Sequence, residues 1–223
     1  NGGDITVVAS DDGVNAVSDT GSPTLTVTGG TLAVDAGGDG LDVNGSITIT
    51  GGTVVVDGPT EDMNGAIDYD GTFDISGGVL IATGSSGMAM APSGDSAQLS
   101  LLSTFSTQEA GTTISVVSSD GTEIASVTPT KRYSSITVST ADVSADDTYS
   151  IVVDGQVLAT TTTADAVSQG GPGGMIDAWV CGQRPVVVPR VHDLGEHVDN
   201  HQVAFARHMA AQDQIDVAED EAT

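Results

Sequence analysis

Positive charge is nearly absent from this sequence. Its 223 residues include five Lys and Arg against 31 Asp and Glu, and the formal net charge is −26. Because so few side chains could neutralise phosphates, we expect no nucleic-acid partner. All five basic residues lie after residue 130, so the carboxylates of the first 130 residues have no cationic side chain among themselves. Those carboxylates must be solvated or neutralised by bound cations.

Cysteine, aromatic residues and long apolar runs are scarce as well. A single cysteine excludes an internal disulfide. No run approaches the roughly 18 apolar residues of a membrane helix, so we expect no membrane insertion. Aromatic residues make up 3% of the chain, and the remaining apolar residues are mostly Val, Ile, Leu and Ala. These smaller side chains suit a thin core between stacked strands.

The first half of the chain is a repeat. The segments LTVTGGTLAVD (25–35), ITITGGTVVVD (47–57) and FDISGGVLIAT (73–83) each place a Gly-Gly pair between two β-rich stretches, and DITVVAS (4–10) resembles the second half of an earlier copy. Alternating β-branched residues predict strands, and paired glycines permit a sharp corner. The spacing of the pairs, 22 and 26 residues, predicts a parallel β-helix with coils about 4.8 Å apart. The alternative is a β-sandwich of hairpins.

Polar loops follow the second stretch of each repeat, and they also align. Stacking is expected to form one column from Asn15, Asp42 and Asp68, a second from Asp12, Asp39 and Asn64, and part of a third from Asn44 and Asp70. Carboxylates about 4.8 Å apart repel by roughly 3–4 kcal/mol at an effective dielectric constant near 20. Carboxylate and amide oxygens are ligands of Ca²⁺, so we predict that these eight residues bind calcium. The alternative is a solvated acidic face adapted to high salt.

The most specific parts of the repeat are AIDYDG (66–71) and GSSGMA (84–89). With them, residues 2–155 resemble the C-terminal coils of a family of bacterial carbohydrate-binding domains. The resemblance implies a right-handed parallel β-helix similar to pectate lyases, bound calcium, and a secreted or cell-surface location. It also implies a polysaccharide partner, because the type member binds cellulose and polygalacturonate. Strands at 112–117, 123–128, 135–138 and 149–153 would close this domain, which we expect to span 1–163. Members usually have further coils before this point, so we expect an uncapped N-terminal edge.

Catalysis is not expected of this domain. Pectate lyases remove a proton with Ca²⁺ and a basic residue, and residues 1–130 contain neither Arg nor Lys. We therefore predict calcium-dependent binding of a plant cell-wall type polysaccharide, either an acidic pectin-like glycan bridged by the ion or cellulose. Tyr69 is the aromatic residue in the loop columns, and it could contact sugar or pack internally. A salt-adapted surface protein or adhesin stalk is the structural alternative.

The composition changes near residue 164. Residues 164–223 contain a glycine-rich turn (170–174), two amphipathic helix candidates (175–181 and 203–212) and an apolar strand candidate (184–190), which together predict a short α/β fragment. The fragment resembles the C-terminal end of family 28-like GT-B glycosyltransferases, which use UDP-sugars. That resemblance implies a nucleotide-sugar site formed by Gly171, Pro172, Gly173, Glu196, His201 and Gln202. About sixty residues are too few to form such an enzyme alone. A relationship to UDP-sugar glycosyltransferases is therefore kept as an alternative for the function of the chain.

Overall fold

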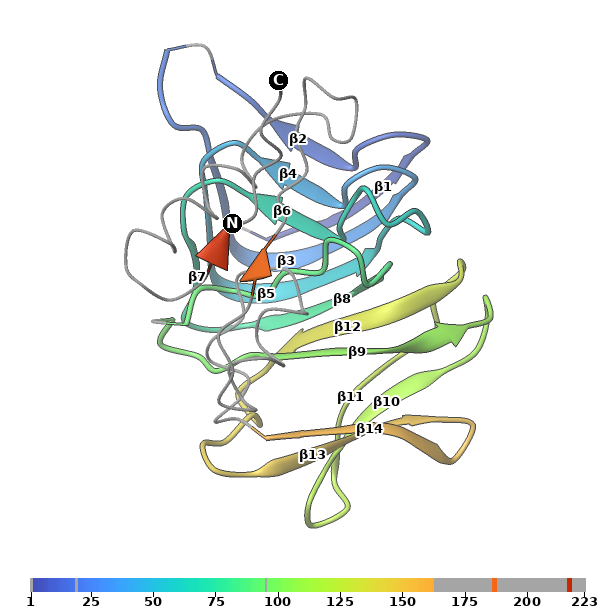
Figure 1. The fold of residues 1–223 in the computed structure, drawn as a ribbon. Coiled ribbons are helices and arrows are strands. Elements are labelled where there is room, and N and C mark those ends of the chain that lie inside the picture. The colour runs from blue at the N-terminus through green and yellow to red at the C-terminus, as the bar shows by residue number, and fades with distance from the viewer. Residues whose placement is uncertain (1, 19, 95, 163–185, 188–215, 218–223) are drawn as a thin grey trace. The chain divides into compact units, whose positions relative to one another are not determined.

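Figure 1 shows the computed structural model of the chain, which describes residues 2–18, 20–94, 96–162, 186–187 and 216–217. The chain divides into two units, Asn1–Gly171 and Pro172–Thr223. All regular elements in the described ranges are strands, which confirms the all-β prediction for that part of the chain. In the second unit, β15 (Val186–Val187) pairs in parallel with β16 (Asp216–Val217). The two predicted helices of the tail lie outside the described residues.

The first unit contains a parallel β-helix of about three turns. Its main sheet stacks four parallel strands: β1 (Asp4–Ala9), β3 (Thr24–Ala36), β5 (Ser46–Asp57) and β8 (Val79–Gly84). β7 (Phe73–Ile75) pairs with the first half of β5, whereas β8 pairs with its second half. The copies therefore stack in the predicted register, and parallel pairing excludes the sandwich of hairpins. Figure 1 shows the strands one above another.

The Gly-Gly pairs form the corners of the coils. The second glycine of each pair has a positive φ: +85° at Gly30, +92° at Gly52 and +90° at Gly78. A Cβ atom on Gly52 would lie 2.8 Å from the carbonyl oxygen of Gly30, and one on Gly78 would lie 2.6 Å from that of Gly52. Stacked corners thus require both the left-handed conformation and the missing side chain.

A third face is made of three short parallel strands, β2 (Val14–Ala16), β4 (Leu41–Val43) and β6 (Ile67–Tyr69). Alternate residues of the coil strands point inward, as period-2 patterning requires. The inward side chains of the central coils are fully buried and form one apolar core: Ala36, Leu41, Val43, Ile47, Ile49, Val54, Phe73, Ile75 and Leu80. Because these apolar side chains point inward, the polar side chains that alternate with them point outward.

Antiparallel strands close one end of the β-helix. β12 (Tyr133–Ser139) pairs antiparallel with β8 and with β9 (Leu101–Gln108), which ends the parallel stack. A second sheet has the order β11 (Glu123–Val127), β10 (Ile114–Ser118), β13 (Thr148–Val153) and β14 (Gln156–Thr162). The four predicted closing strands are confirmed within a few residues. β9 and β14 were not predicted.

Serine side chains close the edge of β7. The Ser93 hydroxyl accepts a hydrogen bond from the Phe73 N–H (2.9 Å), and the Ser96 hydroxyl accepts one from the Ile75 N–H (3.1 Å). These oxygens replace the carbonyl groups that another coil would offer. At the opposite end of the β-helix, β1 has β3 as its one strand partner in the described sheet, and Ile5 and Val8 are 57% and 77% exposed.

Candidate metal site

The polar residues of the short strands stack as predicted in the first column. Asn15, Asp42 and Asp68 occupy equivalent positions of β2, β4 and β6. The Asn15 amide nitrogen donates one hydrogen bond to Asp42 Oδ2 and one to Asp12 Oδ2, both 2.9 Å long. Asn15 therefore presents its nitrogen to the two carboxylates. It links them as a hydrogen-bond donor, which differs from the predicted role of metal ligand.

The second column lies just before these strands. Asp12 Oδ1 accepts a hydrogen bond from the Asp39 N–H (2.9 Å), and Asp39 Oδ1 accepts one from the Gly65 N–H (2.5 Å). Gly65 is thus the residue that stacks on Asp39 in the second column, where Asn64 was predicted. Asn64 lies three residues before Ile67, whereas Asp39 lies two residues before its partner Leu41, so Asn64 is one position out of register with Asp39. The backbone carbonyl of Asn64 accepts a hydrogen bond from the Ser85 hydroxyl.

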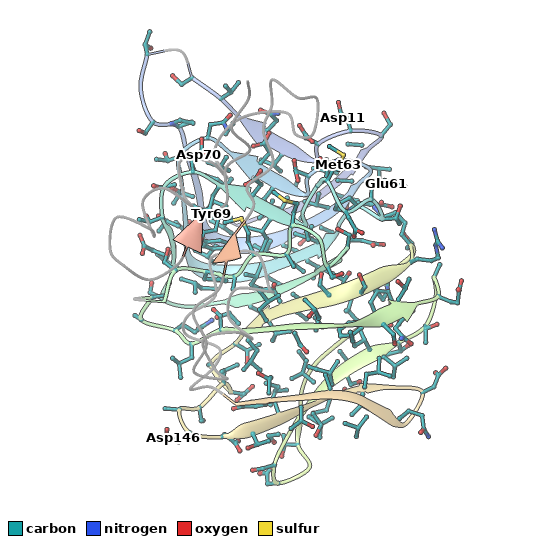
Figure 2. All side chains as sticks on the ribbon, viewed as in Figure 1. Asp11, Glu61, Met63, Tyr69, Asp70 and Asp146 are labelled. Carbon is teal, nitrogen blue, oxygen red and sulfur yellow. The ribbon has the colours of Figure 1, made fainter. Side chains whose placement is uncertain are left out.

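The third predicted pair lies after the strands. The Asn44 amide nitrogen donates a hydrogen bond to Asp70 Oδ2 at 3.2 Å, so this pair is in register as predicted. Here too the asparagine presents nitrogen, and not oxygen, to the carboxylate. Figure 2 shows Asp70 at one end of the short strands and Asp11, Glu61 and Met63 at the other. The eight predicted ligands are therefore distributed along the short strands and over both of their ends.

Three of the eight converge. Asp12, Asp39 and Asp42 each offer a carboxylate oxygen, and these oxygens lie within 4.8 Å of one another. All three residues are half-buried. A group of three carboxylates that share one small volume could hold a metal ion, and a set made wholly of oxygens matches a hard divalent cation better than zinc or copper.

The electrostatics of the site concentrate on Asp39. Burial, together with the nearby charges of Asp68, Asp12 and Asp42, raises the pKa of its carboxyl group from 3.8 to about 7, although the hydrogen bond from the Gly65 N–H acts in the opposite direction. Near neutral pH this carboxyl group therefore binds a proton more readily than an ordinary aspartate does. A cation bound among these oxygens would favour the ionised form.

Tyr69 is engaged in packing. Its hydroxyl donates a hydrogen bond to the Ala91 carbonyl oxygen (2.8 Å), and its ring meets that of Phe73 edge-on, with centroids 5.8 Å apart and planes at 88°. The hydroxyl therefore holds the segment around Ala91, and the ring packs against β7. This arrangement favours the packing role over a flat platform for sugar.

Sequence reasoning missed Lys131. Lys131 lies between two of the predicted closing strands, far in the sequence from the acids of the coils. Its ammonium group reaches back to Asp35 Oδ1, at 2.7 Å, near the end of β3. The first two of the three repeat segments end in Val-Asp, which places Asp35 and Asp57 in register, but nothing in the repeat points to a lysine 96 residues from Asp35.

The predicted nucleotide-sugar residues of the tail, Gly171, Pro172, Gly173, Glu196, His201 and Gln202, lie outside the described residues. In the described ranges, no helix has the length and apolar character needed to cross a bilayer. Comparison with known proteins found no matching family model, no matching curated protein and no matching solved structure. The function is therefore argued from the site itself.

Proposed function

We propose that this chain is a noncatalytic, calcium-dependent polysaccharide-binding protein of the cell surface or extracellular space, with an acidic, pectin-like glycan as its partner. The observation that carries this proposal is the convergence of Asp12, Asp39 and Asp42 on one small volume at the face of a β-helix. Calcium is the ion proposed for it, because the donors are oxygens and because Ca²⁺ accepts irregular sets of six to eight ligands. Three carboxylates leave further positions for water or sugar oxygens.

An acidic glycan follows from the charge of the protein. With a net charge of −26, the chain repels a polyuronate unless cations lie between them. A calcium ion held by protein carboxylates on one side can bind sugar carboxylates on the other. Cellulose, the neutral alternative, is less favoured, because its readers usually present aromatic rings and Tyr69 is used in packing.

Catalysis is not part of the proposal. The candidate site holds carboxylates and asparagines, and the basic residues among the described ones are Lys131 and Arg132. Lys131 is bound to Asp35 and to backbone carbonyls of the coils, so it is not positioned as a base for a sugar held at the triad.

Titration calorimetry of the full chain with polygalacturonate tests this proposal. Binding is expected in Ca²⁺ and is expected to be lost in EDTA, and Mg²⁺ should replace Ca²⁺ poorly because it demands a stricter octahedron. A variant in which Asp12 and Asp42 are both Asn should lose binding, whereas Asp74→Asn, which removes one carboxylate on another face, should keep it. Equal affinity in Ca²⁺ and EDTA would contradict the bridging mechanism.

Metal binding itself is measured separately by thermal melting. A ligand that binds only the folded state stabilises it by RT ln(1 + [L]/Kd), which is about 2.7 kcal/mol at a hundredfold excess over Kd. If the melting temperature responds to molar KCl and not to millimolar Ca²⁺, the acidic face is an adaptation to salt, as in a surface stalk. A shift caused by a UDP-sugar would instead favour the glycosyltransferase relationship.

A further inference from the structure

A second pair of stacked acids lies at the ends of the main strands. Asp35 of β3 and Asp57 of β5 are direct neighbours in the parallel register. Two like charges at this spacing repel, and no basic residue precedes them in the chain. The groups that bind these two carboxylates, one ammonium group and two neutral hydrogen-bond donors, come from the turn before β12, more than seventy residues later.

The Lys131 ammonium group lies among three oxygens. It donates hydrogen bonds to Asp35 Oδ1 (2.7 Å), to the Ala36 carbonyl (2.5 Å) and to the Asp57 carbonyl (2.8 Å). An ammonium group has three N–H donors, so this set uses them all. The Lys131 side chain is 24% exposed, compared with 40% for Asp35. The cation is thus largely enclosed by the coils.

Thr130 completes the contact. Its backbone N–H and its hydroxyl both donate to Asp57 Oδ2, each at 2.6 Å. The Thr130–Lys131 turn therefore satisfies both carboxylates of the pair. It joins strand β12, which covers β8, to the two coils that precede β8.

We propose that the oxygens of Asp35, Ala36 and Asp57 form a cation site in their own right, which the tethered ammonium group of Lys131 occupies. Carboxylate and carbonyl oxygens arranged around a small cation are the donor set of a hard-cation site, and here the cation is part of the chain. The site fastens the closing strands to the coils. The inference is independent of the proposed function, because it uses neither the Asp12, Asp39 and Asp42 triad nor a glycan.

Removal of the side chain and rescue by small amines test this inference. Lys131→Ala in the full chain is expected to lower the melting temperature by several degrees. Methylammonium should restore at least half of that loss, because its N–H donors fit the vacated space. Tetramethylammonium at the same concentration should restore much less, because it has no N–H donor. In Lys131→Met the apolar part of the side chain stays in place and leaves no space for an amine. The melting temperature should therefore fall, and neither amine should restore it.

Arg132→Ala is the matched control, since Arg132 is the exposed neighbour of Lys131 and its loss changes the net charge equally. It should melt like the parent chain. Equal recovery with both amines would show a general ionic effect and would overturn the inference, as would an unchanged melting temperature for Lys131→Ala. If Lys131→Ala does not fold, refolding in methylammonium decides: recovery supports the site, and failure in both buffers overturns it.

Discussion

Replacing Asp39 with asparagine is expected to stabilise the chain without calcium and to reduce the additional stability that calcium gives. Burial and the neighbouring acids raise the pKa of Asp39 from 3.8 to about 7. In the unfolded chain this group ionises above about pH 4, so the folded state binds more protons between pH 4 and 7. Its contribution to stability is therefore complete below pH 4 and is lost as the pH rises through 7.

The size of the effect follows from that shift. Three pKa units correspond to about 4 kcal/mol at most, at 1.36 kcal/mol per unit. Because Asp39 is only half-buried and solvent screens it, we expect about 1–2 kcal/mol. In EDTA at pH 8, Asp39→Asn should therefore melt about 2–8 °C above the parent chain, given about 2–4 °C per kcal/mol for a chain of this size. The Asn side chain can still accept the Gly65 N–H.

Melting curves at pH 5 and pH 8, each in EDTA and in saturating Ca²⁺, provide the measurement. The advantage of Asp39→Asn in EDTA should shrink at pH 5, and Ca²⁺ should raise the melting temperature of the parent chain more than that of the variant. Asp74→Asn removes one exposed carboxylate away from the site. It should melt like the parent chain in EDTA and should show the same shift with Ca²⁺. A variant that is less stable than the parent in EDTA at pH 8 would refute the electrostatic reasoning.

Three further predictions concern the coils and are checked by urea unfolding. Gly52→Ala should lower the free energy of unfolding by about 1–3 kcal/mol because of its positive φ alone, and by more because its Cβ would meet the neighbouring corner. Gly111→Ala is the control, because Gly111 has a positive φ but open space around it, so it should show only the first loss. Equal losses in the two variants would contradict the steric argument. Ile49→Ala, fully buried, should lose about 2–5 kcal/mol, and a loss below 1 would contradict its place in the core. Tyr69→Phe should lose about 1 kcal/mol by leaving the Ala91 carbonyl without its donor, while polygalacturonate binding stays unchanged; loss of binding would restore Tyr69 as a sugar contact.

The fold could be predicted because its determinants are local and repeated. A Gly-Gly pair between two alternating stretches indicates a corner, and its recurrence gives the register of the coils. The buried positions on either side of Asp42, Leu41 and Val43, force that carboxylate outward. Stacking of Asn15 and Asp68 upon it follows from the same register.

Other features of the site were not predicted. Counting back from the paired residues Leu41 and Ile67 places Gly65, and not Asn64, beside Asp39, so a shift of one residue in the alignment gives the wrong partner. The orientations of the Asn15 and Asn44 amides depend on which neighbours are acids. The reach of Lys131 to Asp35 joins positions 96 residues apart, and such a contact follows only from the closed tertiary structure.

The two kinds of strand pairing bear on how such a chain can change its length during evolution. β3 meets parallel neighbours on both sides, so a duplicated copy of its coil would find equivalent partners above and below. β8 meets an antiparallel neighbour in β12, and a coil added after it would displace that strand. Lengthening by internal duplication is therefore the accessible route. Each added copy would repeat Asp39 and Asp42 and so add one aspartate to each of the first two columns, and the demand for cations would grow with the number of coils.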